Sequence, residues 1–384
     1  MPGAEVLARQ LRVCVVGGAV GSLVAARLAL GGADVTVVRR GAAEAPTSAA
    51  AAPGAPASAP LATGVARLVL GDGVAHAVPV RVAAGLRALS APSAFDVVVV
   101  AVKARDTAQV ARELRECAAR RALGPGAAVV SLQNGAGNVE LLRAELEQAA
   151  FPVLPALTYM GVGSPAPLVA QVFGRGRTVV GSPAAPAALA AVHALAAAYN
   201  RGVTTPAEQL SVSSELQPMV WTKLLANSVI NPLTALLGRE NGCVADSRLL
   251  PLVRRAAREF EQVAAKEGVR LQLPDGFDAA AFVLSVATGT AANTSSMLAD
   301  VRAGRHTEVD AINGCVVQRA RAHGVNVPVL ESLAHLVRAL HPHESDHGPT
   351  QCGAVQSGAL QSGATQGTES GGIQSGATQS GTSL

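Results

Sequence analysis

The stretch Arg12-Val13-Cys14-Val15-Val16-Gly17-Gly18-Ala19-Val20-Gly21-Ser22 decides the expected fold. Its β-branched start predicts a buried strand, and the glycines that follow predict a tight turn. Residues 23–30 then predict a helix that ends at Gly31-Gly32, and residues 34–38 predict a second strand. This order is the setting of a dinucleotide-binding turn, in which glycines let the backbone approach a pyrophosphate and the helix N-terminus stabilises its negative charge.

The glycine pattern departs at one position from the G-x-G-x-x-G pattern of such turns. Gly18 and Gly21 occupy the second and third glycine positions, and Val16 stands at the first. Gly17 is the candidate replacement, with the turn displaced by one residue. A glycine turn without a ligand is the alternative, but the two flanking strands and the helix favour nucleotide binding. The candidate cofactor-binding residues are Gly17, Gly18, Ala19, Val20 and Gly21.

The second predicted strand ends in a basic pair, Arg39-Arg40. NAD sites carry an acidic residue here, which binds the ribose 2′-hydroxyl, whereas an arginine pairs with a 2′-phosphate. Arg40 therefore predicts NADP(H) as the cofactor, and a solvated basic pair is the alternative. Residues 41–63 are rich in Ala, Pro and Ser and predict a flexible insertion, for which the sequence offers no function.

Further strands extend the α/β pattern. Residues 65–70 and 74–80 predict a hairpin, and the valine run at 95–102 predicts a central parallel strand. Lys103 follows that strand, and Asn134 follows the strand predicted at 127–132. A cation and an amide are thus expected at the carboxyl edge of the sheet, where open α/β sheets bind ligands. We predict a doubly wound, Rossmann-type α/β domain over residues 12–206.

Residues 207–342 are mostly helical in pattern and predict a second, all-helical domain. One of its helices contains Lys223 and Asn227 one turn apart, with Asn231 one turn further. A buried lysine is costly unless it is paired, and its pKa shifts readily, so Lys223 is a candidate proton donor. The alternative is that Lys223 reaches water and that Asn231, which precedes Pro232, marks a kink or the end of the helix.

Composition limits the functional classes. The net charge of +4 comes without a basic run that contains aromatic residues, so nucleic-acid binding has little support. The five cysteines are scattered, which fits reduced thiols and predicts no metal site. We expect no membrane span and no signal peptide, and therefore a cytoplasmic protein, with organellar targeting and a homodimer left open. Residues 343–384 repeat Gln-Ser-Gly and are expected to be disordered.

Three features, taken together, resemble the ketopantoate reductase (2-dehydropantoate 2-reductase) family over roughly residues 12–342. The first is the glycine turn with its basic strand end. The others are W-T-K-L-x-x-N-x-x-I-N-P-L-T-A at 221–235 and S-S-M-L-x-D-x-R…R-H-T-E-x-D-x-I-N-G at 295–314. The resemblance implies NADPH-dependent reduction of ketopantoate to pantoate, a step of pantothenate and coenzyme A biosynthesis.

The resemblance also implies roles for single residues. Lys223 is similar in position to the family's general acid, and Glu308 to the acid that interacts with substrate or cofactor near it. Implied cofactor contacts are Gly18, Gly21, Arg40, Lys103 and Asn134, and implied substrate contacts are Asn134, Asn227, Asn231, Asn241 and Ser296. Two alternatives stay open: a reductase of another branched 2-keto acid, and a non-catalytic NADP-binding protein in which Val16 and the insertion mark lost cofactor affinity.

Overall fold

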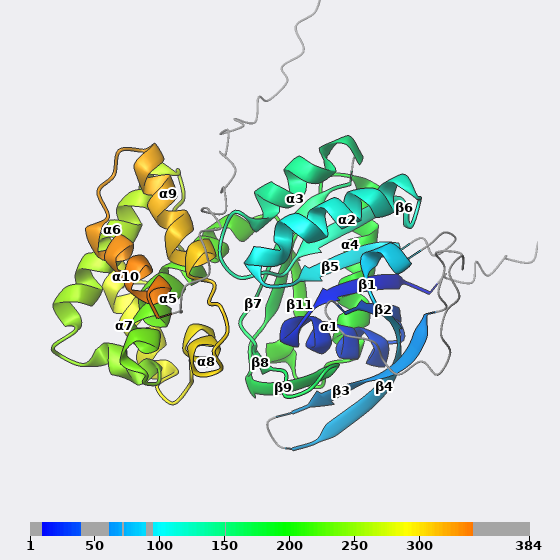
Figure 1. The fold of residues 1–384 in the computed structure, drawn as a ribbon, viewed down its shortest axis with the longest axis horizontal. Helices are drawn as coiled ribbons and strands as arrows, with labels where there is room; N and C mark the ends of the chain where they lie inside the picture. The colour runs from blue at the N-terminus through cyan, green and yellow to red at the C-terminus, as the bar shows by residue number, and fades with distance from the viewer. Residues whose placement is uncertain (1–9, 40–60, 71–72, 90–94, 150, 341–384) are drawn as a thin grey trace, which may run out of the picture. The chain divides into compact units, whose positions relative to one another are not determined.

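A mixed sheet of eleven strands organises the first part of the chain (Figure 1). The computed structural model describes residues 10–39, 61–70, 73–89, 95–149 and 151–340, so Arg40, most of the predicted insertion and the predicted tail lie outside the described residues. The strand order is β11-β10-β7-β6-β5-β1-β2-β4-β3-β9-β8. The strands are β1 (Arg12–Gly17), β2 (Asp34–Val38), β3 (Ala62–Val69), β4 (Ala75–Ala83), β5 (Phe95–Ala101), β6 (Leu123–Ser131), β7 (Val153–Thr158), β8 (Gly161–Gly163), β9 (Val169–Gly174), β10 (Thr178–Gly181) and β11 (Leu210–Ser213).

The strand β1 lies at the centre of the parallel part of the sheet. It pairs in parallel with β2 on one side and with β5 on the other, and β6 and β7 continue the parallel order beyond β5. The chain passes from β1 to β2 in one direction and later returns to β5 on the other side of β1. The boundary between β1 and β5 is therefore a switch point, where open α/β sheets bind ligands at the carboxyl ends of their strands.

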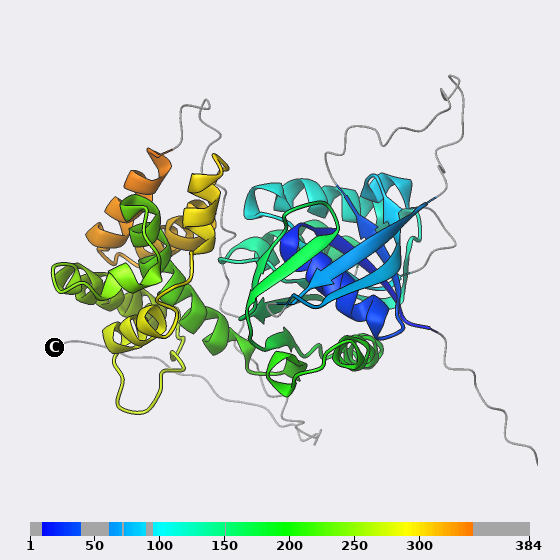
Figure 2. The same cartoon turned by 90° about the horizontal axis from the view of Figure 1, so that it is seen from below.

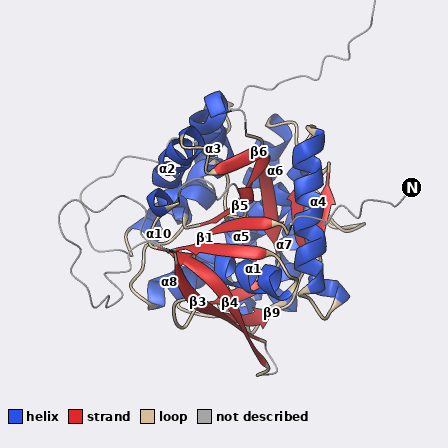
Figure 3. Cartoon of the chain, turned by 90° about the vertical axis from the view of Figure 1, so that its right-hand side faces the viewer, coloured by secondary structure: helices blue, strands red, loops and turns tan. Residues whose placement is uncertain are grey.

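Helices cover both faces of this sheet, as Figures 2 and 3 show. Val15 belongs to the core with α1 (Ala19–Leu30) and α4 (Pro186–Arg201), whereas its neighbour Val16 belongs to the core with α2 (Thr107–Ala119) and α3 (Asn138–Leu146). Successive side chains of a strand point to opposite faces, so a continuous valine run is what a doubly covered strand requires. The predicted doubly wound α/β fold is confirmed.

The outer strands differ from the parallel centre. The predicted hairpin is present as the antiparallel pair β3 and β4, and β10 runs antiparallel to β7. The strands β8 and β11 and the helix α3 were not predicted. The strand β8 spans only Gly161–Gly163, and so short a segment carries no readable hydrophobic period. The strand β11 extends the sheet past residue 206, and the predicted domain division at that residue stays a prediction.

Six α-helices form the described chain beyond the sheet: α5 (Leu216–Leu237), α6 (Leu250–Lys266), α7 (Ala279–Gly289), α8 (Ser296–Arg302), α9 (Cys315–Ala322) and α10 (Pro328–Arg338). Shorter turns are η1 (Leu86–Ala88), η2 (Ala104–Asp106), η3 (Glu147–Ala149), η4 (Pro206–Glu208), η5 (Asn241–Ala245) and the π-helix η6 (Asp310–Gly314). Trp221 and Phe260 meet edge-on in the core of these helices, with ring centroids 5.7 Å apart. None of the described helices has the length and apolar character that crossing a bilayer requires.

The helix α5 continues through Pro232 to Leu237. It therefore does not end near Asn231, which was one of the two alternatives for this position. A proline inside a helix leaves one carbonyl of the preceding turn without its usual donor. Here the side-chain amide of Asn313 donates to the carbonyl of Ser228 at 2.8 Å and fills that gap. Gly238, in the left-handed conformation at φ 65°, then ends the helix.

Candidate active site

The glycine turn begins at Gly17, one residue later than the standard pattern. Val16 is a fully buried strand residue that pairs with Val38 and Val100, and it takes no part in the turn. Gly17 has φ +151°, and a Cβ atom placed on it would lie 2.4 Å from the carbonyl of Ala101. With valine at position 16, the turn begins one residue later, at Gly17. Gly17 then makes the close approach of β1 to β5 that only glycine permits.

The first turn of α1 is open to an anion. Gly18 is the N-cap residue, has no atom within 4 Å of an ideal Cβ, and makes no side-chain cap bond, and the first turn contains no acidic residue. The backbone N–H groups of Ala19, Val20 and Gly21 are therefore the helix-terminal donors that have no partner inside the helix. Such a terminus carries partial positive charge, and the residues present fit the pyrophosphate of a dinucleotide.

Lys103 lies two residues past the end of β5 and connects the sheet to the helices. Its Nζ atom donates to Oδ2 of Asp300 at 2.9 Å and to Oε2 of Glu308 at 3.2 Å. Partial burial acts to lower the pKa of Lys103, but the charges of Glu308 and Asp300 outweigh it and raise the pKa above its usual value. Lys103 is thus a fixed positive charge at the carboxyl edge of the sheet.

Lys223 comes from α5 and reaches the same edge of the sheet. Its Nζ atom donates to Oδ1 of Asn134 at 2.9 Å and to the carbonyl of Thr158 at 2.8 Å. Both acceptors lie at the carboxyl ends of parallel strands, Asn134 after β6 and Thr158 as the last residue of β7. An ammonium group has three donors, so one N–H of Lys223 has no acceptor among the described residues.

The pKa of Lys223 is set by two opposing effects. Burial lowers the pKa to about 8 because it disfavours the charged form, and the negative charge of Glu308 opposes that shift. A lysine with this pKa is still mostly protonated at neutral pH. It also releases a proton more readily than an exposed lysine, which suits general acid catalysis. Lys223 is half-buried and its ammonium group is bonded to Asn134 and Thr158, which favours this interpretation over the alternative in which Lys223 simply reaches water.

Glu308 is buried beside both lysines. Its Oε1 atom accepts from the backbone N–H of Ala104 at 3.3 Å, in addition to the bond from Lys103 to Oε2. The π-helix η6 follows directly, and the carbonyl of Ala311 accepts from the N–H of Ala136 at 2.9 Å. This bond holds the loop that carries Asn134 against the segment that carries Glu308, so the two predicted residues share one site.

The remaining predicted substrate residues lie along α5 and around the start of α8. Asn227 and Asn231 follow Lys223 on α5, and their side-chain amides make no hydrogen bond within the described ranges. Asn241 begins η5; its amide nitrogen donates to Thr290 at 2.9 Å, and its buried Oδ1 atom has no partner in the described structure. An unpaired buried acceptor is costly, and a ligand hydroxyl would satisfy it.

Two adjacent serines have different surroundings. Ser295 is the N-cap of α8, where its hydroxyl accepts from the N–H of Leu298 at 3.0 Å and lies 2.7 Å from the hydroxyl of Thr234 on α5. Ser296 is exposed in the first turn of the same helix. The capping function belongs to Ser295, which leaves the Ser296 hydroxyl available to a ligand.

Sequence reasoning missed two groups of this site, Thr158 and Asp300. The carbonyl of Thr158 binds Lys223 through the backbone, so no side-chain pattern could point to it. Asp300 stands in the motif at 295–314 without an assigned role, although it is three residues after the core residue Met297 and falls on the same helix face. That spacing was the available signal for a buried acid.

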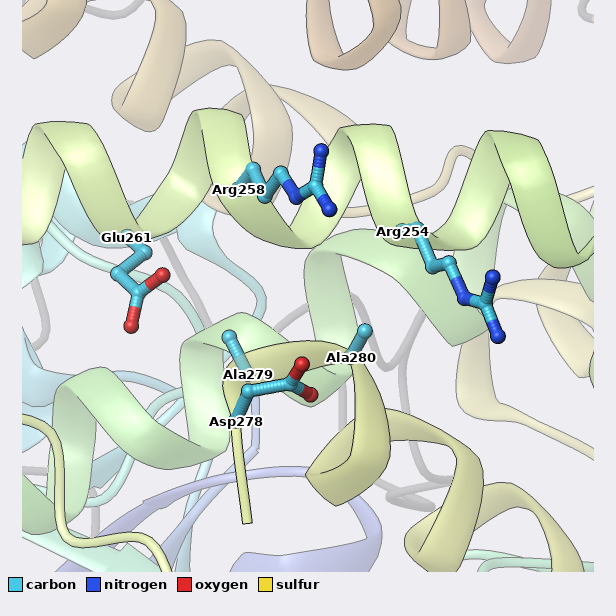
Figure 4. A pocket seen from close by; sticks show the side chains of 6 residues that line it. All are labelled: Arg254, Arg258, Glu261, Asp278, Ala279 and Ala280. Carbon is cyan, nitrogen blue, oxygen red and sulfur yellow. The ribbon is translucent and has the colours of Figure 1, made fainter.

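Two pockets in the described structure differ in their distance from the candidate site residues. A small pocket of about 50 Å³ lies beside Lys103 and Glu308. A larger pocket of about 270 Å³ lies between α6 and the start of α7, with Arg254, Arg258 and Asp278 around it (Figure 4). It contains none of the predicted site residues and mixes exposed charges of both signs. The two lysines and Glu308, where half-buried cations are bonded to buried or neutral acceptors, therefore remain the candidate site.

Comparison with known proteins gives the family. The family model described as ketopantoate reductase PanE/ApbA matches residues 58–185, and that of its C-terminal part matches residues 215–341. The 2-dehydropantoate 2-reductase of Halobacterium salinarum is 38% identical over 248 residues, which are 63% of this chain and 75% of that protein. This chain belongs to the ketopantoate reductase family. The 2-dehydropantoate 2-reductase of Archaeoglobus fulgidus is 34% identical over 252 residues, 65% of this chain and 78% of that protein.

A solved ketopantoate reductase shares the fold. The PanE/ApbA family ketopantoate reductase from Ralstonia eutropha JMP134 is 27% identical with a TM-score of 0.69, and the match covers 86% of this chain and 98% of that one. Membership of the ketopantoate reductase family makes this protein an oxidoreductase, and it confirms the resemblance drawn from the three sequence features.

Proposed function

We propose that this protein is an NADPH-dependent 2-dehydropantoate 2-reductase, which reduces the keto group of 2-dehydropantoate to the hydroxyl of pantoate in pantothenate and coenzyme A biosynthesis. The observation that carries the proposal is the half-buried ammonium group of Lys223, held by Asn134 and Thr158 at the edge of the sheet that also bears the glycine turn. The names of the relatives from Halobacterium salinarum and Archaeoglobus fulgidus support the substrate.

Lys223 would act as the general acid. When the keto carbon accepts a hydride, negative charge develops on its oxygen, and a nearby ammonium group stabilises that charge before donating a proton. The N–H of Lys223 that is not bound by Asn134 or Thr158 is the one available to the keto oxygen. Glu308 would help to keep Lys223 protonated until that transfer, because its charge opposes the effect of burial.

The other predicted residues would hold the two ligands. Bound NADPH supplies the hydride. We assign its pyrophosphate to Gly17, Gly18 and the first turn of α1, and we place Lys103 and Asn134 on the cofactor side of the site. The unpaired amides of Asn227 and Asn231, the unpaired Oδ1 atom of Asn241 and the exposed hydroxyl of Ser296 offer hydrogen bonds to the carboxylate and hydroxyl groups of the substrate.

The preference for NADPH rests on the end of β2. Arg39 donates its backbone N–H to the carbonyl of Ala83 at 3.0 Å, which fixes the backbone immediately before Arg40. We propose that Arg40 pairs with the 2′-phosphate. Arg40→Glu should then raise the KM for NADPH and leave the KM for NADH unchanged or lower. An unchanged ratio of the two KM values would remove Arg40 from the cofactor site.

The decisive experiment follows the absorbance of NADPH during its oxidation by ketopantoate. We expect turnover with ketopantoate and NADPH, and much slower turnover with 2-ketoisovalerate or with NADH. Faster turnover of 2-ketoisovalerate would move the assignment to another branched 2-keto acid. NADPH binding without turnover of either acid would favour a binding protein over an enzyme.

The assignment of Lys223 has its own test. Lys223→Met should lower kcat by about 10²–10⁴-fold, the usual contribution of a general acid. Since reduction needs the protonated lysine, kcat should be level below the pKa of about 8 and fall above it, and Lys223→Met should abolish this fall. Lys266→Met, which removes an exposed lysine of α6, is the matched control and should leave the profile unchanged. Equal activity of the two variants would refute the mechanism.

A further inference from the structure

Asp300 has no assigned part in the chemistry, yet it lies against Lys103. The geometry points to Asp300 as a positioning residue that holds the ammonium group of Lys103, so that the carboxylate of Glu308 remains available to Lys223 and to the substrate. This inference rests on the proposed function and adds a residue to its site.

Asp300 is a buried carboxylate with both oxygens bound. Its side chain is only 4% exposed on α8. Oδ2 accepts from Lys103 at 2.9 Å. Oδ1 accepts from Nε of Arg305 at 3.0 Å and also lies 3.0 Å from Nη2 of the same guanidinium group. Burial of a carboxylate is costly unless cations and hydrogen bonds compensate it, and here two cations do so. The helix that carries Asp300 is fixed by its Ser295 cap and by Met297 and Leu298 in the core.

Lys103 has to be shared between two carboxylates. The bond to Asp300 is the shorter of the two, at 2.9 Å against 3.2 Å for Glu308. With Asp300 present, the positive charges of Lys103 and Arg305 are balanced by the negative charges of Asp300 and Glu308. If the charge of Asp300 is removed, Lys103 is left with Glu308 alone, and the surroundings of Lys223 gain one net positive charge. The negative charge of Glu308 then stabilises the charged form of Lys223 less.

The other groups around this cluster do not replace Asp300. Arg105, His306 and Asp310 line the pocket beside Lys103, whereas the two acceptors of Lys223 are the neutral amide of Asn134 and the neutral carbonyl of Thr158. A purely structural explanation would assign Asp300 to Arg305, because the N–H of Arg305 also donates to the backbone carbonyl of Asp300 at 2.8 Å. An experiment therefore has to separate the partner Lys103 from the partner Arg305.

A double-mutant cycle makes this separation. The variants are Asp300→Asn, Lys103→Met, the double variant, and Arg305→Met, all in the full chain. We expect Asp300→Asn to lower kcat/KM for ketopantoate about tenfold and to shift the fall of kcat with pH to lower pH. In the Lys103→Met background the same substitution should change kcat/KM less than about twofold, since the group it acts through is gone. Arg305→Met should remain near the activity of the natural chain.

Two outcomes of the activity measurements would overturn the inference. Either Asp300→Asn lowers kcat/KM equally in both backgrounds, or Arg305→Met reproduces the effect of Asp300→Asn. The cycle is also measured by thermal unfolding midpoints, which need no turnover. If the natural chain fails to reduce ketopantoate while positions 103 and 300 remain coupled in stability, the proposed function fails and the pairing stands; additive midpoints would overturn the pairing itself.

Discussion

A general acid must be protonated at the working pH and still release its proton readily, and single residues would decide this at Lys223, the proposed general acid. Burial and the charge of Glu308 act on its pKa in opposite directions and leave it at about 8. Asn134 and Thr158 fix the position of the same group without adding charge. The pKa of Lys223 is therefore set by burial and, against it, by one carboxylate, and the effect of that carboxylate can be tested directly.

Glu308→Gln keeps the shape of the side chain and removes its charge. Without the charge that opposes burial, the pKa of Lys223 should fall below about 8. Since the protonated form is the active one in reduction, the fall of kcat with rising pH should then begin at a lower pH. The pH profile of NADPH oxidation measures this. Glu331→Gln, at an exposed ion pair with Arg321, is the control and should leave the profile in place. A profile of Glu308→Gln that matches this control would exclude the electrostatic effect.

The sequence predicted the polar residues that stand out from an apolar pattern. Lys223 and Asn227 interrupt an apolar helix, and Lys103 ends a valine strand, so each was visible as an exception. Asp300 lies within the motif at 295–314, but its position alone assigned it no role. Its partner Lys103 is 197 residues away in the chain, and no local pattern connects them.

At the scale of elements, the two neighbouring glycines of the turn between β1 and α1 differ in the space around them. A Cβ on Gly17 would lie 2.4 Å from the carbonyl of Ala101, whereas a Cβ on Gly18 would meet nothing within 4 Å. Gly17→Ala should lower the free energy of unfolding by about 1–3 kcal/mol, as measured by thermal unfolding, and should weaken NADPH binding. Gly18→Ala should unfold like the natural chain and weaken NADPH binding only, because its new methyl group occupies the space we assign to the pyrophosphate. Unchanged NADPH affinity of Gly18→Ala would place the pyrophosphate elsewhere.

A second element-scale prediction concerns α5, whose proline leaves the carbonyl of Ser228 dependent on Asn313. Asn313→Ala removes that donor from a fully buried position and should lower the free energy of unfolding by about 1–3 kcal/mol. Pro232→Ala restores a backbone N–H at the usual helical position. In that background the cost of Asn313→Ala should be smaller by about 1 kcal/mol, since Ser228 keeps a donor. Equal costs in both backgrounds, measured by denaturant unfolding, would contradict this account of the helix.

Elements with a strong period were predictable and elements set by distant contacts were not. The strand at 34–38 and the valine strand after it were placed correctly, since their residues are buried on both faces. The continuation of α5 through Pro232 was not foreseen, because the group that compensates for the proline, Asn313, is 85 residues away from Ser228. The π-helix η6 was likewise not foreseen, since the pattern over residues 207–342 predicted helices without showing where one of them widens.

For the whole molecule, a few long-range bonds connect the sheet with the helices that follow it. Lys103 reaches Asp300 and Glu308, Lys223 reaches Asn134 and Thr158, and Ala136 donates to Ala311. Most of these bonds belong to the proposed active site, so their removal would change activity and stability together. A further connection lies outside the proposed site: Arg319 of α9 joins Glu140 of α3 to Glu267 after α6.

Arg319 allows the contribution of this connection to stability to be measured separately. Its side chain is 10% exposed, lies 5.5 Å from the centre of the Trp221 ring, and forms ion pairs with Glu140 at 3.3 Å and with Glu267. Arg319→Met should lower the free energy of unfolding by about 2–3 kcal/mol, because Glu267 is left largely buried without its main cation. Glu140→Gln should cost less than about 1 kcal/mol, since that carboxylate is partly solvated.

Arg321→Met is the matched control on the same helix. The Arg321 side chain is 69% exposed in its ion pair, so this variant should lower the free energy of unfolding by only about 0–0.5 kcal/mol. Thermal unfolding of the three variants gives the order, and an Arg319→Met variant as stable as Arg321→Met would show that the ion pairs of Arg319 contribute nothing measurable to the connection between the sheet and the helices.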